Sequence, residues 1–184
     1  MTGIYKADWM QALARNKQYG LSVPAVYTAP QEKYFTDSRI AELPKIIQPA
    51  LAGLTFDDLV CQCLAIHFNL LPVMQDWLGC PVYFTLGWID DGKNGMFKFG
   101  DPLIKSLLDG EPRSSVVNLH AWLTLPSMEI FDVTLSTTIA KVNNLPEGYG
   151  GVFSQHPDSL KGIAFKPMLL GEEFLIRSKL LRFE

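Results

Sequence analysis

Hydrophobic and polar positions alternate along residues 116–134, and this alternation predicts two short β-strands. Successive side chains of a strand point to opposite faces. One face of the first strand is uniformly apolar and is expected to belong to the core; the other carries Asn118, His120, Trp122 and Thr124. Pro126 and Ser127 predict a tight turn, after which a second strand runs from Ile130 to Leu135.

Folding these strands about the turn predicts that Asp132 lies opposite His120 or within one residue of it. Directly opposed residues have Cβ atoms about 4.5–5.5 Å apart, close enough for a carboxylate to orient an imidazole. A buried aspartate needs a partner, and His120 is the only obvious one in the sequence. Such a pair is the base half of a catalytic triad, which then needs a nucleophile. Trp122 is expected to pack beside His120, to shield it from water and, with His156, to contact substrate.

An apolar stripe at helical spacing predicts one helix from Thr55 to Gly79. Thr55 is a suitable N-cap, Pro72 is expected to kink the helix, and Gly79 is expected to end it. Cys63 falls near the middle of the buried face, and Cys61 falls at its edge. The helix therefore supplies two candidate nucleophiles.

Cys63 is the preferred nucleophile and Cys61 is the alternative, because a thiolate attacks and a neighbouring histidine lowers the pKa of its thiol. The competing interpretation is that both are small buried hydrophobic residues. His67 lies one helical turn after Cys63 and competes with His120 as the base, although a lone histidine on an apolar face is more often a hydrogen-bonded core residue. His156 lies in an expected loop, where it would contact a substrate.

The remaining pattern predicts further elements around this centre. Residues 143–162 are rich in glycine, proline and asparagine, which is typical of a long loop that covers a cleft. Prolines 44 and 49 should break or shorten a helix that runs from Arg39 to Leu51. The other expected elements are a helix over 4–20, a strand from Pro81 to Ile89, a helix from Asp101 to Leu108 and a strand or helix from Phe174 to Phe183.

Four segments in this order resemble the transglutaminase-core pattern of the papain-like superfamily: Cys63-Leu-Ala, Leu78 to Gly87, His120-Ala-Trp and Asp132-Val-Thr. The resemblance covers about the middle third to half of the chain. It implies an α+β, papain/transglutaminase-like fold in which a central helix carries the cysteine. That helix packs on an antiparallel sheet that carries the histidine and the aspartate.

The chain departs from the family pattern at the cysteine. Family nucleophiles occupy the first turn of their helix, whereas Cys63 follows Thr55 by about two turns. Either the helix begins later than Thr55, or Cys61 is the nucleophile.

The resemblance implies a cysteine-dependent hydrolase that cleaves an amide or peptide bond through a thioester acyl-enzyme. Cys63 would attack the carbonyl, His120 would transfer the proton, and Asp132 would fix the histidine tautomer. The same triad serves transglutaminases, deamidases and acyltransferases, and the fold also suits a non-catalytic binding module. A small chain of this kind resembles bacterial secreted effectors or toxins that act on cell-wall peptides or proteins, for which an inhibitor or immunity protein is an expected partner.

Length and composition narrow the function classes. The 184 residues are expected to form a single domain over 1–184, with its core about 55–140. A hydrophobic content of 48% and a charged content of 19% indicate a globular protein. The net charge of −3, with no polybasic tract, argues against nucleic acid as the main partner.

The sequence predicts neither a membrane span nor a metal or other cofactor. No apolar run approaches the roughly 18–20 residues that a transmembrane helix needs. The N-terminus shows no signal pattern, so we expect synthesis in the cytoplasm and, for action elsewhere, export by a non-classical route. The three cysteines and three histidines lack the spacing of a disulfide framework or a zinc site.

Overall fold

The computed structural model describes residues 3–26, 32–111 and 117–180, without the side chain of Cys61. The described chain is of mixed α+β class, as predicted, and its residues form two compact units. Unit 1 comprises Met1–Ala25, Phe84–Ala121 and Pro157–Glu184, and unit 2 comprises Val26–Tyr83 and Trp122–His156. The papain/transglutaminase-like assignment and the single domain stay predictions. In the described part of the chain, no helix has the length and apolar character needed to cross a membrane.

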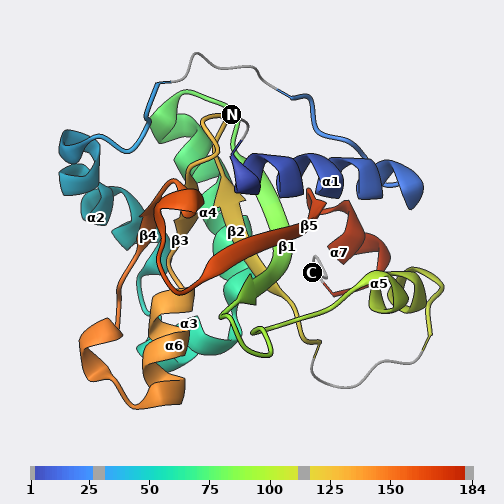
Figure 1. The fold of residues 1–184 in the computed structure, drawn as a ribbon. Helices are drawn as coiled ribbons and strands as arrows, with labels where there is room; N and C mark the ends of the chain where they lie inside the picture. Colours follow the sequence, from blue (N-terminus) through green and yellow to red (C-terminus); the bar gives the residue numbers. More distant parts are fainter. Residues whose placement is uncertain (1–2, 27–31, 112–116, 181–184) are drawn as a thin grey trace. The chain divides into compact units, whose positions relative to one another are not determined.

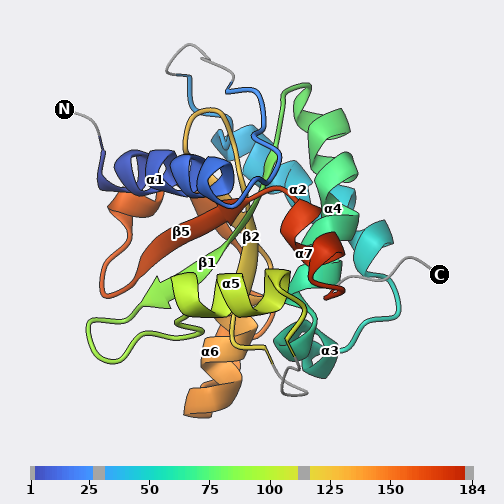
Figure 2. The same cartoon turned by 90° about the vertical axis from the view of Figure 1, so that its right-hand side faces the viewer.

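Unit 1 is built on an antiparallel strand pair covered by a helix. Strand β1 (Tyr83–Asp90) pairs with β5 (Ala164–Leu170), and helix α1 (Ile4–Gln18) packs along β5 (Figures 1 and 2). The buried amide of Asn16 fixes this contact, because its Nδ2 donates to the Leu170 carbonyl at 2.6 Å and its Oδ1 accepts from the Leu170 N–H at 3.0 Å. Unit 1 also contains α5 (Asp101–Leu108), the 3-10 turn η2 (Pro157–Ser159) and α7 (Glu173–Arg177). The predicted helices over 4–20 and 101–108 are confirmed.

Unit 2 combines helices with short antiparallel strands. Strand β2 (His120–Thr124), which begins at the last residues of unit 1, pairs with β3 (Ile130–Asp132), and β3 pairs with β4 (Phe153–Gln155). Helix α3 (Phe56–Cys61) lies beside α6 (Leu135–Asn143) in both views (Figures 1 and 2). The other helices are α2 (Asp37–Leu51), α4 (Cys63–Leu78) and the 3-10 turn η1 (Pro146–Gly148). The predicted long loop over 143–162 is therefore broken up by β4, η1 and η2.

The β2–β3 hairpin turns at Pro126 and Ser127 as predicted, but its register differs. The Leu125 N–H donates to the Glu129 carbonyl at 2.9 Å, and Met128 takes a left-handed conformation with φ 68°. Met128 thus adds one residue to the turn, as in hairpins with a bulge. Leu123 pairs with Phe131, and continuing this register places Trp122 opposite Asp132. The prediction that Asp132 lies opposite His120 or within one residue of it is wrong, because His120 is two residues away from that position.

Helix α2 is continuous from Asp37 to Leu51, so the predicted interruption by proline is wrong. Pro44 and Pro49 both have exposed side chains. The carbonyls that lose a helical partner at each proline therefore lie on the side of the helix that water reaches. The buried side, which includes Leu43 and Ile47, keeps the helix packed.

Candidate functional site

Cys63 is the first residue of a helix. Helix α3 ends at Cys61, Gln62 has φ −121° and ψ 27°, and α4 begins at Cys63. The prediction of one continuous helix from Thr55 to Gly79 is therefore wrong, because the helix is interrupted at Gln62. Both predicted ends are confirmed: Thr55 is the N-cap of α3, and Gly79 ends α4 at φ 64°. The sequence left two explanations for the late position of Cys63. The structure matches the first, in which the helix carrying Cys63 begins after Thr55.

This position has a chemical consequence for the Cys63 thiol, which is half-buried. The first N–H groups of a helix have no intrahelical partner, and the helix dipole stabilises an anion beside them. Cys63 occupies this position in the 16-residue helix α4. Gln62, directly before Cys63, has an exposed side chain.

The other cysteines differ from Cys63. Cys61 is the last residue of α3, and its side chain lies outside the described part of the structure. Burial raises the pKa of the Cys80 thiol above its usual value, although a side-chain hydrogen bond with Tyr34 opposes this shift. Cys80 therefore carries less thiolate at neutral pH than a free cysteine does.

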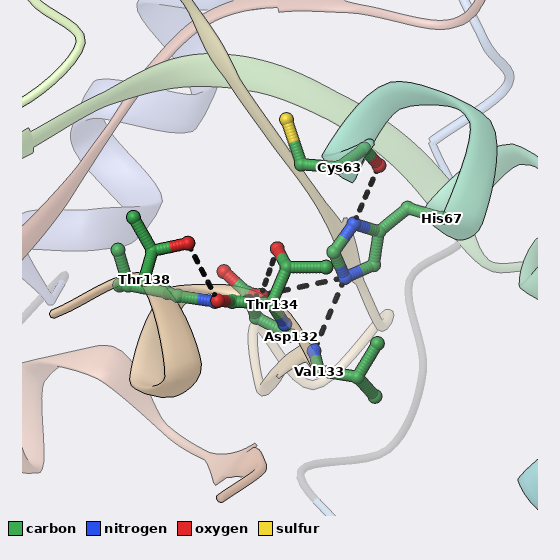
Figure 3. A network of polar contacts seen from close by, with 7 residues as sticks. Cys63, His67, Asp132, Val133, Thr134 and Thr138 are labelled. Atoms are coloured by element: carbon green, nitrogen blue, oxygen red, sulfur yellow. Dashed lines mark hydrogen bonds and ion pairs between the residues drawn. The ribbon is translucent and has the colours of Figure 1, made fainter. Parts of the chain in front are cut away.

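His67 is fully buried and is hydrogen-bonded through both ring nitrogens (Figure 3). Its Nδ1 lies 2.8 Å from the Cys63 carbonyl oxygen, and its Nε2 lies 3.2 Å from the Val133 backbone nitrogen. These two bonds fit a neutral ring with its proton on Nδ1, so that Nε2 accepts from the Val133 N–H. The Cys63 sulfur points away from the ring (Figure 3). His67 thus holds the backbone of Cys63 and matches the expectation of a hydrogen-bonded core histidine.

Asp132 is also fully buried, and it has more partners than the sequence indicated. Its Oδ1 accepts from the Thr134 N–H at 2.8 Å, the Thr134 hydroxyl at 3.0 Å and the Leu135 N–H at 3.0 Å. The same oxygen lies 3.4 Å from His67 Nε2. This last contact becomes an ion pair only if Nε2 gains a proton, which would remove the acceptor of the Val133 N–H.

Asp132 therefore holds the start of α6. Two of its three donors are backbone N–H groups at the beginning of that helix, and the Thr138 hydroxyl extends the network to the Thr134 carbonyl at 2.9 Å. The expectation that His120 is the only obvious partner of Asp132 is wrong, because these groups of unit 2 bind its carboxylate.

His120 is buried, with 1% of its surface exposed, and belongs to unit 1. Its ring stacks on the ring of Phe97, with centroids 5.0 Å apart and planes inclined by 19°. Phe97 has φ 59°, an uncommon conformation for a bulky aromatic residue. The proposed triad takes Cys63 and Asp132 from unit 2 and His120 from unit 1, and it stays a prediction.

The two residues expected to contact substrate differ in exposure. Trp122 is fully buried, so it would influence a substrate only through its neighbours. His156 is half-buried and directly follows β4. Among residues 3–26, 32–111 and 117–180, no group of three or more His, Cys, Asp or Glu side chains is arranged to hold a metal ion.

The sequence did not predict the hydrogen bond from the Val133 N–H to His67 Nε2. The only sequence signal was the four-residue spacing of Cys63 and His67, which places both on one face of a helix. The bond to Val133 joins residues 66 positions apart, and no local pattern encodes it.

No protein-family model and no curated protein matches the sequence, and no solved structure matches the fold. The papain/transglutaminase-like relationship therefore rests on the sequence resemblance alone.

Proposed function

We propose that the protein is a cysteine-dependent hydrolase that cleaves an amide or peptide bond, with Cys63 as its nucleophile. The observation that supports this most is the position of Cys63 as the half-buried first residue of α4. A nucleophilic cysteine at a helix N-terminus is a recurrent way to favour the thiolate. It is also the position that the transglutaminase-core resemblance assigns to the nucleophile.

In the proposed mechanism, His120 takes the thiol proton of Cys63, and the sulfur attacks the carbonyl carbon of the substrate. His120 then protonates the leaving amine as the carbon–nitrogen bond breaks, which leaves a thioester on Cys63. Water, deprotonated by the same histidine, attacks the thioester and releases a carboxylic acid. Asp132 is the proposed group that orients His120, and an amine in place of water would give transfer.

Cell-wall peptides are the proposed substrate class, on the strength of the resemblance to small bacterial effectors. Action on a cell wall would require export of the protein from the cell that makes it. An inhibitor or immunity protein would then protect the producing cell.

The second candidate is a non-catalytic binding module of the same fold. The hydrogen bonds of His67 and Asp132 favour it, because they explain both buried polar groups as structural without any reaction. In this alternative Cys63 is an ordinary half-buried thiol.

Product analysis separates the two candidates. Purified bacterial cell-wall peptides and a protein substrate such as casein are incubated with the wild type and with Cys63→Ser, and new amine and acid termini are identified by mass spectrometry. The proposal predicts new termini with the wild type only, and hydroxamate products when hydroxylamine replaces water. Equal products from both proteins would contradict it, and so would the absence of any cleavage or hydroxamate with a folded wild type.

A further inference from the structure

Unit 2 contains an open pocket of about 380 Å³ to which the mechanism above assigns no role. Its wall is formed by the end of α2, by the start of α3 with the residues before it, by Val133 after β3, and by Gly150 and Val152 before β4. The apolar side chains in this wall include Ile47, Leu51, Leu54, Phe56, Leu59 and Val133. The volume lies at the lower end of the roughly 300–1,000 Å³ that small-molecule sites occupy.

Polar groups of the wall are already hydrogen-bonded within the protein. The Thr55 N–H and hydroxyl both donate to Asp58, and the Val133 N–H donates to His67. The Gly150 N–H donates to the Thr137 hydroxyl at 2.9 Å. A ligand would gain little by offering hydrogen-bond partners to these groups, so the pocket favours a hydrocarbon group.

The mouth of the pocket exposes aromatic surface. The Phe56 side chain is 51% exposed, and its ring centroid lies 5.4 Å from that of Tyr149, which is 37% exposed. A Cβ on Gly150 would come within 3.3 Å of the Phe56 ring, so the absence of a side chain there lets the ring lie against the backbone. Large exposed apolar side chains around a concave site are typical of a binding surface.

The charged residues on the wall elements and next to them are mainly acidic. Asp57 and Asp58 follow Phe56 on α3, and exposed Glu147 lies on η1, three residues before Gly150. Lys141 of α6 is paired with Asp57. Lys45 of α2 is two positions before Ile47, which places it on the opposite side of that helix. This arrangement disfavours a ligand whose polar end is an anion.

We propose that this pocket binds the hydrocarbon chain of a small molecule whose polar end is neutral or cationic. The proposal does not require Cys63 to be a nucleophile. It does connect the pocket with Cys63, because Val133 forms part of the wall while its N–H binds His67, and His67 binds the Cys63 carbonyl.

The test uses the full chain labelled at isoleucine, leucine and valine methyl groups and follows them by NMR. It is titrated separately with 1-octanol, octyltrimethylammonium and octanoate, which share one chain and differ in the charge of the polar end. We expect 1-octanol and octyltrimethylammonium to shift the methyl signals of Ile47, Leu51, Leu59 and Val133. We expect octanoate to bind at least about fivefold more weakly, because the acidic side chains repel it.

Variants make the assignment specific. Phe56→Ala removes an exposed part of the wall and should weaken 1-octanol binding at least about threefold. Val142→Ala is the matched control. The Val142 side chain lies on α6 and is 68% exposed, so this variant should leave the affinity for 1-octanol unchanged. The proposal is overturned if the wall methyl groups do not move, if those of Ile104 and Leu107 in unit 1 move as much, or if octanoate binds as tightly as the other two ligands.

Discussion

Two buried histidines of this protein are held in different ways. His67 in unit 2 is hydrogen-bonded through Nδ1 to the Cys63 carbonyl and through Nε2 to the Val133 N–H. His120 in unit 1 is stacked on the Phe97 ring at 5.0 Å. A ring stack covers the face of an imidazole, whereas hydrogen bonds engage the nitrogens at its edge.

The contacts of His67 indicate a structural role for this residue. A general base must exchange a proton at a ring nitrogen, and both nitrogens of His67 are engaged in tying α4 to the segment between β3 and α6. The stack of His120 is compatible with proton transfer at the ring edge. We therefore assign a structural role to His67, and the resemblance remains the support for the proposed catalysis by His120.

The largest effect is expected at the carboxylate of the His67 network. Asp132→Ala should lower the free energy of unfolding by about 3–5 kcal/mol, because Thr134 and Leu135 would lose a buried charged acceptor. Asp132→Asn keeps an oxygen acceptor and should cost clearly less. Urea denaturation of the three proteins checks this order, and equal losses for the two variants would show that Oδ1 does not hold the start of α6.

The His67 side chain should contribute strongly to stability through its hydrogen bonds. His67→Ala should cost about 2–4 kcal/mol, because it leaves the buried Val133 N–H without its acceptor and opens a cavity. A loss well below about 1 kcal/mol in denaturation of His67→Ala would contradict the structural role of His67.

The Cys80 thiol provides an internal reference for reactivity. Because burial raises its pKa, its thiolate fraction at pH 7 is lower than that of a free cysteine and should still be rising above pH 9. Carboxymethylation of Cys80 measured by mass spectrometry from pH 6 to pH 10 should show this late rise. A plateau of the Cys80 rate near pH 8 would contradict it.

The smallest effect is expected at the cap of α3, which precedes Cys63. The hydrogen bonds with the side chain and backbone of Thr55 lower the pKa of Asp58. Its contribution to stability is thus present above the unfolded pKa, near pH 4, and is lost as the pH falls through the lower folded pKa. The stability difference between the wild type and Asp58→Asn should therefore be small at pH 7 and shrink towards pH 3. A difference that grows on acidification would have the wrong sign.

Local pattern predicted the parts of the fold that depend on neighbouring residues. Alternation identified the β2–β3 hairpin, and Pro126 with Ser127 identified its turn. The extra turn residue Met128, at φ 68°, follows no residue preference, so the register differed from the prediction. Strand β5 was not predicted, since it contains Pro167, which pairs with Gly87 at an irregularity in the ladder.

For the candidate site, the sequence predicted which residues are involved but not all of their contacts. Residue type and spacing named Cys63, His67, His120 and Asp132. They did not reveal the break at Gln62, because its cause is not a helix-breaking residue. They also assigned Asp132 to His120 alone, because the backbone donors of Thr134 and Leu135 become visible only once the chain has turned into α6.

The most direct test of the proposed nucleophile is iodoacetamide labelling at pH 6–7, with each modified cysteine quantified by mass spectrometry. The comparison includes the wild type, His120→Ala and His67→Gln, with Cys80 as the internal reference. We predict that Cys63 of the wild type is labelled faster than Cys80 and Cys61, and that His120→Ala slows Cys63 more than His67→Gln does. Equal, slow labelling of all three cysteines, with no change in His120→Ala, would contradict the hydrolase proposal and leave the binding module.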